Sequence, residues 1–222
     1  EINKLESIDS VKGVLLETKY NILLDVAVPL INTSNFWNSG YNGSGVKVCV
    51  IDSGVNSSHP ALSPRVIAQK DFVTSDSDGD TPIDFNGHGT HVAGIVASND
   101  SLYRGVAPAA SILNAKVFSS TTGLASDIDI MSAIDWCINQ SANVLTLSLG
   151  NSTENTDGSD ALSQYADLAV DQGKILTIAA GNSGPNASTI NCPGCAHKII
   201  SVGATYKQSY SGSVSWSSGC TD

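Results

Sequence analysis

The feature that most constrains the fold is an alternation of short apolar strands with amphipathic helices along the chain. Residues 46–52 are almost continuously apolar, which is typical of a parallel strand buried on both faces. The same patterns predict further strands at 111–117, 144–149, 175–180 and 199–204, and helices at 126–139 and 159–171. Strands and helices in this order require right-handed crossovers. We therefore expect an α/β fold of three layers, in which a doubly wound parallel sheet has helices on both faces.

Polar residues follow three of these predicted strands at the point where each strand ends. The three breaks are Asp52-Ser53-Gly54, Ser148-Leu149-Gly150 and Gly181-Asn182-Ser183-Gly184. Ligands of open parallel sheets bind beyond the carboxyl ends of the strands. We therefore expect a functional site at this edge of the sheet.

One histidine stands between two glycines, in the stretch Asn86-Gly87-His88-Gly89-Thr90-His91. The apolar residues that follow predict a buried helix with His88 at its start. An imidazole in that position can transfer protons, although a lone histidine is more often packed in a core. An aspartate such as Asp52 can fix the tautomer of the imidazole, and an amide such as Asn182 can donate to an oxyanion.

Taken together, these stretches resemble the subtilisin-like serine proteases, or subtilases. The resemblance rests on Val50-Ile51-Asp52-Ser53-Gly54-Val55, Ser58-His59-Pro60, Asp84-Phe85-Asn86-Gly87-His88-Gly89-Thr90-His91-Val92-Ala93-Gly94, Gly105-Val106-Ala107-Pro108, Ser148-Leu149-Gly150, Ala179-Ala180-Gly181-Asn182 and Val202-Gly203-Ala204. These blocks follow the order of the family from about Asn32 to the C-terminus. The resemblance implies a subtilisin-like fold and a serine-type endopeptidase that hydrolyses peptide bonds with a Ser/His/Asp triad.

The resemblance also implies roles for individual residues. Asp52 corresponds to the catalytic aspartate, His88 to the general base and Asn182 to the oxyanion donor. Ser148, Leu149 and Gly150 resemble the strand edge that binds the backbone of a protein or peptide substrate. His91, inside the predicted helix, is interpreted as packing support.

The nucleophile of the family lies in a Gly-Thr-Ser-Met-Ala block, and this block is absent from residues 1–222. We therefore expect a fragment of a longer protease, truncated at the C-terminus and inactive alone. The alternatives are a piece that assembles with a separate nucleophile-bearing piece, and a catalytically dead, peptide-binding relative. Residues 1–28 resemble the tail of a pro-segment and a connector, and residues 29–222 a partial catalytic domain. The chain's own pro-segment is thus an expected partner.

Two other classes of function are alternatives to a serine protease. A metal-dependent hydrolase would use His88 and His91 with Asp52 or Asp84, but the motif lacks the glutamate base of His-Glu-x-x-His enzymes. A nucleotide-binding module would need its glycine-rich turn after a strand. The glycines of residues 40–45 precede the predicted strand instead, so they do not form a phosphate-binding turn.

Composition and charge narrow the expected partners. The net charge of −10 disfavours binding to nucleic acid, and no apolar run is long enough to span a bilayer. We expect a secreted or extracytoplasmic monomer that requires no cofactor for its chemistry. Asp76, Asp78 and Asp80 have an oxygen-rich spacing that suits a structural calcium ion, and an ordinary solvated acidic loop is the alternative.

The five cysteines allow several arrangements. Cys49 lies in a predicted strand and Cys137 in a predicted helix, so both are interpreted as buried small apolar residues. Cys192 and Cys195 are expected to form a local disulfide, or one of them to pair with Cys220. A zinc site that adds His197 to these three cysteines is a further alternative.

Overall fold

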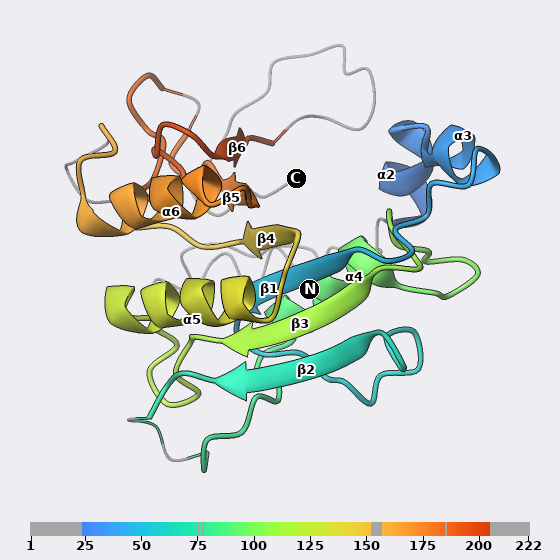
Figure 1. Cartoon of the computed structure of the whole chain (residues 1–222), viewed down its shortest axis with the longest axis horizontal. Coiled ribbons are helices and arrows are strands. Elements are labelled where there is room, and N and C mark those ends of the chain that lie inside the picture. Colours follow the sequence, from blue (N-terminus) through green and yellow to red (C-terminus); the bar gives the residue numbers. More distant parts are fainter. Residues whose placement is uncertain (1–23, 75, 77, 152–156, 185, 205–222) are drawn as a thin grey trace, which may run out of the picture.

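The structure is a computed structural model that describes residues 24–204 apart from 75, 77, 152–156 and 185. In this part of the chain, six parallel strands form one sheet in the order β2-β3-β1-β4-β5-β6 (Figure 1). The strands are β1 (Lys47–Asp52), β2 (Val66–Asp71), β3 (Ser111–Lys116), β4 (Val144–Leu147), β5 (Ile175–Ala179) and β6 (Ile200–Val202). The helices are α2 (Leu24–Leu30), α3 (Thr33–Asn38), α4 (His88–Ala97), α5 (Asp127–Asn139) and α6 (Ala161–Asp171).

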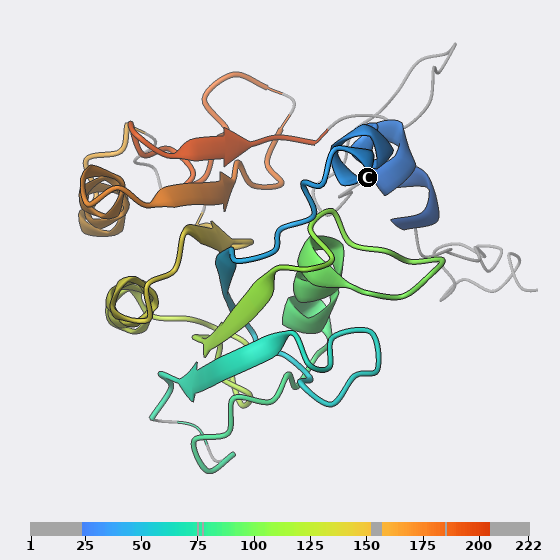
Figure 2. The ribbon, with the colours of Figure 1, turned by 45° about the vertical axis from the view of Figure 1, so that its right-hand side comes forward.

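The helices lie on both faces of the sheet, as Figure 2 shows. Helices α5 and α6 pack side by side on one face, and α4 packs on the other against β1 and β3. The predicted three-layer α/β fold is therefore confirmed. None of the described helices combines the length and the apolar character that crossing a membrane requires.

Strand β1 lies between two separate hydrophobic cores. Cys49 and Ile51 belong to the core beneath α5 and α6, whereas Val48 and Val50 belong to the core beneath α4. Because side chains alternate between the faces of a strand, a strand covered on both faces must be apolar at consecutive positions. The burial of β1 explains the continuous apolar run in its sequence.

Helix α5 begins at an N-cap formed by Ser126. The Oγ atom of Ser126 accepts a hydrogen bond from the backbone N–H of Asp129 at 3.2 Å, and its hydroxyl donates to the Asp129 carboxylate at 2.7 Å. Helix α6 begins in a similar way, because the carboxylate of Asp160 accepts the N–H of Ser163 at 2.9 Å.

Two parts of the fold differ from the sequence prediction. Strand β2 was not predicted, because it lies at the edge of the sheet and its residues alternate between partly buried and exposed. The end of the segment 1–28, interpreted from sequence as a connector, lies in helix α2 (Leu24–Leu30). In the next segment, the Nε1 of Trp37 donates a 2.9 Å hydrogen bond to the Val106 carbonyl. Phe36 is largely exposed.

The predicted burial of Cys49 and Cys137 is confirmed, but their interpretation as simple small apolar residues is wrong. Both are fully buried, but they form a disulfide whose Cα atoms are 5.9 Å apart. Cys49 lies on the face of β1 that α5 covers, and Cys137 lies on the buried side of α5. Packing of the helix on the strand brings the two sulfur atoms together. The two cysteines are 88 positions apart in the sequence, so a local pattern does not predict this contact.

Candidate active site

A hydrogen-bonded aspartate and histidine form the centre of the site. Asp52 is the last residue of β1, and His88 is the first residue of α4. The Nδ1 atom of His88 lies 2.7 Å from Oδ1 of Asp52. The Asp52 side chain is 1% exposed, whereas that of His88 is 51% exposed. The pair therefore combines a buried carboxylate with an imidazole that solvent and ligands can reach.

A hydrogen-bond network around Asp84 fixes the turn that carries His88. The carboxylate of Asp84 accepts the backbone N–H groups of Gly87 at 3.0 Å and Thr90 at 2.8 Å. It also accepts the hydroxyl of Ser53 at 2.9 Å, and the Ser53 Oγ in turn accepts the N–H of Gly89 at 3.0 Å. The network links the end of β1 to the start of α4, so it holds the two members of the pair together.

The positions of Ser53 and Asp84 in this network were missed by the sequence analysis. Ser53 was noted only as a polar residue at a strand end, and Asp84 only as a possible metal ligand. Both residues stand within the motifs that resemble the subtilases, and this was the available signal of a role. A local sequence pattern does not show hydrogen bonds between residues 31 positions apart. Both act on the site through backbone groups next to the catalytic candidates.

The two positions beside His88 require glycine for different structural reasons. Gly87 adopts φ 93°, a left-handed conformation that disfavours any residue with a Cβ atom. A Cβ atom on Gly89 would collide with the Gly54 carbonyl and would lie 3.1 Å from Oδ1 of Asp52. The first glycine thus allows the turn, and the second allows α4 to approach the end of β1 closely enough for the 2.7 Å contact.

The environment of His88 raises its pKa above the usual 6.5. The largest cause is the hydrogen bond to Asp52, and the negative charges of Asp52 and Asp84 add to it. Partial burial of the ring acts in the opposite direction and is outweighed. Asp52 therefore stabilises the imidazolium that forms when His88 accepts a proton.

The other predicted site segments lie at the same edge of the sheet. Strands β1, β4 and β5 are adjacent and parallel, with Ile51 paired to Leu147 and Leu147 to Ile178. Ser148-Leu149-Gly150 directly follows β4, and Asn182 lies in the turn just after β5. The structure therefore brings Asp52, the segment 148–150 and Asn182 to one edge, as the sequence predicts. Asn182 is exposed at this edge.

Asn191, which sequence analysis did not single out, connects the two strand ends. Its side chain lies next to Gly150 and Gly181, where added Cβ atoms would stand 3.0 and 2.8 Å from the Cβ of Asn191. Its backbone N–H donates to Ala180 at 2.9 Å, and its Oδ1 accepts the Ser183 hydroxyl at 3.2 Å. Asn191 therefore sets the spacing between the candidate substrate segment and the turn that carries Asn182.

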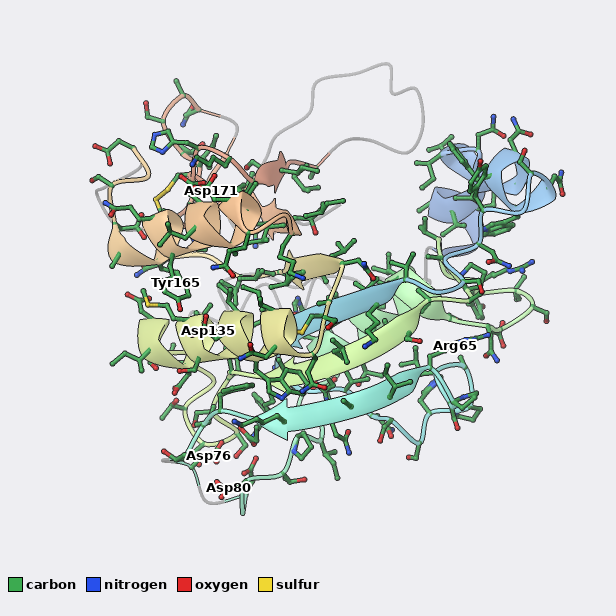
Figure 3. All side chains as sticks on the ribbon, in the orientation of Figure 1. Arg65, Asp76, Asp80, Asp135, Tyr165 and Asp171 are labelled. Carbon is green, nitrogen blue, oxygen red and sulfur yellow. A yellow bond between two sulfur atoms is a disulfide. The ribbon has the colours of Figure 1, made fainter. Side chains whose placement is uncertain are left out.

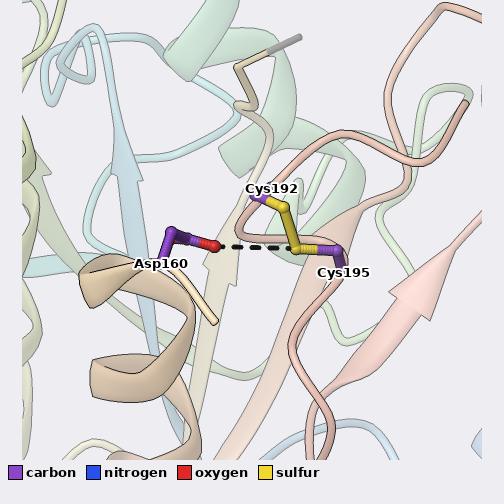
Figure 4. Close-up of side chains that lie close together, drawn as sticks. All are labelled: Asp160, Cys192 and Cys195. Atoms are coloured by element: carbon purple, nitrogen blue, oxygen red, sulfur yellow. Dashed lines mark hydrogen bonds between the residues drawn. A yellow bond between two sulfur atoms is a disulfide. The ribbon is translucent and has the colours of Figure 1, made fainter. Parts of the chain in front are cut away.

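A disulfide closes the short loop that directly follows Asn191. Cys192 and Cys195 are linked, as expected for a local disulfide, and the Cys195 Sγ lies 3.8 Å from Oδ2 of Asp160 (Figure 4). The Cys192 carbonyl accepts the N–H of Asn151 at 2.8 Å, just beyond the segment 148–150. The zinc interpretation is wrong for this state, because oxidation removes both thiolates as ligands. Cys220, which that interpretation also used, lies outside the described residues.

The structure does not favour the metal-dependent hydrolase. His91 is exposed on α4. Its interpretation as packing support is therefore wrong. The oxygens of Asp84 are already bonded to backbone N–H groups and to the Ser53 hydroxyl. Among the described residues, neither cluster with the geometry of a metal site contains a histidine.

An acidic cluster at the carboxyl ends of β2 and β3 fits a structural cation. The carboxylates of Asp71, Asp76 and Asp78 converge on the buried ammonium of Lys116, at 2.5, 3.4 and 2.5 Å. One lysine offsets one of three negative charges, and the Oδ1 atoms of Asp76 and Asp78 are buried without a hydrogen-bond partner in the described chain. Such oxygens suit a hard cation such as Ca²⁺. The predicted third residue, Asp80, is exposed and is replaced in the cluster by Asp71.

The fold and the site define the class of the protein. A doubly wound parallel sheet with a buried aspartate and a hydrogen-bonded histidine at its carboxyl edge is an arrangement that supports nucleophilic catalysis. The sequence model of the subtilase family, also called peptidase S8, matches residues 43–222. The chain belongs to the subtilase family.

Similar proteins include several proteases of Bacillus subtilis. Minor extracellular protease Vpr is 38% identical over 190 residues, which cover 82% of this chain and 23% of Vpr. Serine protease AprX is 34% identical over 215 residues, 90% of this chain and 48% of AprX. Subtilisin E is 38% identical over 208 residues, 92% of this chain and 52% of subtilisin E. The chain thus spans about half the length of these curated relatives, or less.

Proposed function

We propose that the protein to which this chain belongs is a serine endopeptidase that hydrolyses peptide bonds in proteins. The observation that carries the proposal is the 2.7 Å contact between His88 and the buried Asp52 at the carboxyl edge of the sheet. Membership of the subtilase family and the serine protease names of the relatives support it. Asp52 and His88 supply the aspartate and the general base of the triad.

Each residue has a defined part in the proposed reaction. His88 accepts the proton of the attacking serine at Nε2, while its Nδ1 stays bonded to Asp52, which stabilises the imidazolium. Asn182 donates a hydrogen bond to the oxyanion of the tetrahedral intermediate. The segment 148–150 pairs with the substrate backbone as an added strand. His88 then returns the proton to the leaving amine, and it accepts a proton from the water that hydrolyses the acyl-enzyme and passes it back to the serine.

The nucleophile is proposed to come from outside residues 1–222. No Gly-Thr-Ser-Met-Ala block occurs in this sequence, and the hydrogen bond of the His88 ring within the described chain is to Asp52. A serine in such a block, in the same polypeptide or in an assembled second piece, would complete the triad.

The test uses the complete protein and its His88→Ala variant. We expect wild-type protein to cleave a denatured protein substrate and to react with a serine-directed phosphonate. The variant should lose about 10⁶-fold in kcat, because a serine without its base is a poor nucleophile. Unchanged near-ultraviolet circular dichroism would show that its fold is intact. Turnover close to wild type in the folded variant would contradict the proposal.

We also propose the finer organisation of the protein. Residues 1–28 act as the tail of a pro-segment with its connector, residues 29–222 form part of the catalytic domain, and the protein acts as a monomer. The two disulfides support an oxidising, extracytoplasmic location. Asp71, Asp76 and Asp78 would hold a structural calcium ion, which offsets their buried charge and takes no part in the reaction.

A further inference from the structure

Both arginines of the chain line one pocket at the amino-terminal edge of the sheet. Arg65 directly precedes β2 and Arg104 lies in the loop before β3, and the pocket between them measures about 460 Å³. Figure 3 shows Arg65 at one end of β2 and Asp76 beyond the other. The strands are parallel, so this pocket lies at the edge opposite to Asp52.

Neither guanidinium group is neutralised within the described part of the chain. The ion pairs found there involve only lysine and histidine, so no described carboxylate oxygen lies within 4.0 Å of Arg65 or Arg104. The Nε atom of Arg65 is buried and has no hydrogen-bond partner among the residues that the structure describes. A buried charged donor without an acceptor is costly. In a chain with 21 acidic and 11 basic residues, the absence of any described carboxylate at both arginines favours an acceptor other than a side chain of residues 24–204.

Trp37 holds the guanidinium of Arg104 in place. The guanidinium carbon lies 4.4 Å from the centroid of the Trp37 ring, and the ring is fixed by its hydrogen bond to the Val106 carbonyl. A guanidinium that stacks on an aromatic face keeps its N–H donors in its own plane. Stacking therefore leaves these donors available for a ligand.

Neutral polar side chains complete the wall of the pocket. Asn42, Asn99 and Ser101 all line it. The Oδ1 of Asn42 accepts the N–H of Ser44 at 3.1 Å, so its Nδ2 remains as a donor. These groups surround the two arginines with further donors.

Asp100 is the one acidic residue that lines this pocket in the described chain. Its Oδ1 accepts the backbone N–H groups of Leu102 and Tyr103, both at 2.8 Å. These bonds lower its pKa and hold it as part of the loop. With two arginines against one aspartate, the lining carries a net positive charge in a protein of net charge −10.

We propose that this pocket binds a free inorganic oxyanion, such as phosphate or sulfate, between Arg65 and Arg104. The planar N–H forks of arginine match the oxygens of such anions, and the pocket is positive and rich in donors. A bound anion would link the start of β2 to the loop that Trp37 contacts, and so would tie α3 to the sheet. The site is remote from Asp52 and His88, and the inference does not depend on the proposed protease activity.

The test is calorimetric titration of phosphate, with acetate in parallel, at constant ionic strength. The complete protein carries His88→Ala, so that self-digestion cannot interfere. We expect saturable binding of phosphate at one site. Arg65→Gln and Arg104→Gln should each weaken it about 10- to 100-fold, because each removes charge-assisted hydrogen bonds. Lys70→Gln, which removes a positive charge from β2 outside the pocket, should leave the affinity unchanged.

Several outcomes would overturn the inference. These are no saturable phosphate binding, equal affinity in Arg104→Gln, or binding of acetate tighter than that of phosphate, which would define a carboxylate site instead. Arg104 is exposed, so its variants should fold even if Arg65→Gln does not. Arg104→Lys should bind more tightly than Arg104→Gln and less tightly than wild type, because lysine keeps the charge but loses the planar fork.

Discussion

At the scale of single residues, the state of His88 depends on its hydrogen bond to Asp52. The bond raises the pKa of His88, so the protonated imidazole is favoured in the folded protein. This favours folding below the unfolded pKa of about 6.5, and the contribution is lost as pH rises through the higher folded pKa. Catalysis has the opposite requirement, because only neutral His88 can accept a proton. Activity should therefore rise with pH through the raised pKa.

Asp52→Asn in the complete protein tests this dependence. We expect kcat to fall about 10⁴-fold, because an amide no longer holds the required tautomer or stabilises the imidazolium. The pKa in the pH profile of the remaining kcat/KM should also move down, since its main cause is removed. Asp171→Asn, which neutralises an exposed carboxylate on α6, should leave the profile unchanged. A profile of Asp52→Asn that coincides with wild type would show that Asp52 does not set the pKa of His88.

The positions of the candidate site residues were predictable from sequence where they depend on local pattern. Asp52, His88 and Asn182 each stand at the end of an element, and adjacent parallel strands bring such ends to one edge. Asn191 and Asp84 were not predictable in this way. Their importance comes from hydrogen bonds and close packing between segments that meet only in the folded chain.

At the scale of elements, burial made the central strands straightforward to predict from the sequence. The central strands β1 and β3 carry consecutive buried residues, and their apolar runs were predicted to within one residue at either end. Strand β2 pairs on one side only, so its sequence needs no apolar run and resembles a loop. The Cys49–Cys137 link was also hidden, because it depends on how α5 packs on β1.

The two disulfides should differ in what they stabilise. Cys49–Cys137 closes a loop with a sequence separation of 88, against 3 for Cys192–Cys195. Loop-closure entropy gives about 5 kcal/mol for the first and roughly 1–2 kcal/mol for the second. We therefore expect the paired alanine variant of the first to be much less stable to urea than that of the second.

For the activity of the complete protein, we expect loss of the Cys192–Cys195 disulfide to have the larger effect. The Cys192–Cys195 loop directly follows Asn191, whose side chain lies between the two strand ends of the candidate site. Its paired variant should raise KM, whereas the Cys49–Cys137 variant should keep KM near wild type while it remains folded. Equal effects of both pairs on stability and on KM would contradict this division.

At the scale of the whole molecule, acidic charge is the dominant electrostatic feature. The chain carries a net charge of −10, and three carboxylates converge on Lys116 in its interior. Burial opposes ionisation of Asp76, but hydrogen bonds from Ser120 and its other neighbours lower its pKa to about 2. The charge of Asp76 is therefore kept at neutral pH. Its contribution to stability is present above the unfolded pKa of 3.8 and is lost as pH falls toward 2.

Calcium should stabilise the whole fold through this cluster. A cation that binds only the folded state at 100 times its Kd adds about 2.7 kcal/mol, which raises Tm by roughly 5–10 °C for a chain of this size. Thermal unfolding of the complete protein in calcium and in chelator measures this shift. Asp76→Asn should abolish it, because that carboxylate is fully buried in the cluster. Asp80→Asn is the matched control in the same loop and should retain it, since Asp80 is exposed and lies outside the cluster. A shift that survives in Asp76→Asn would place the calcium elsewhere.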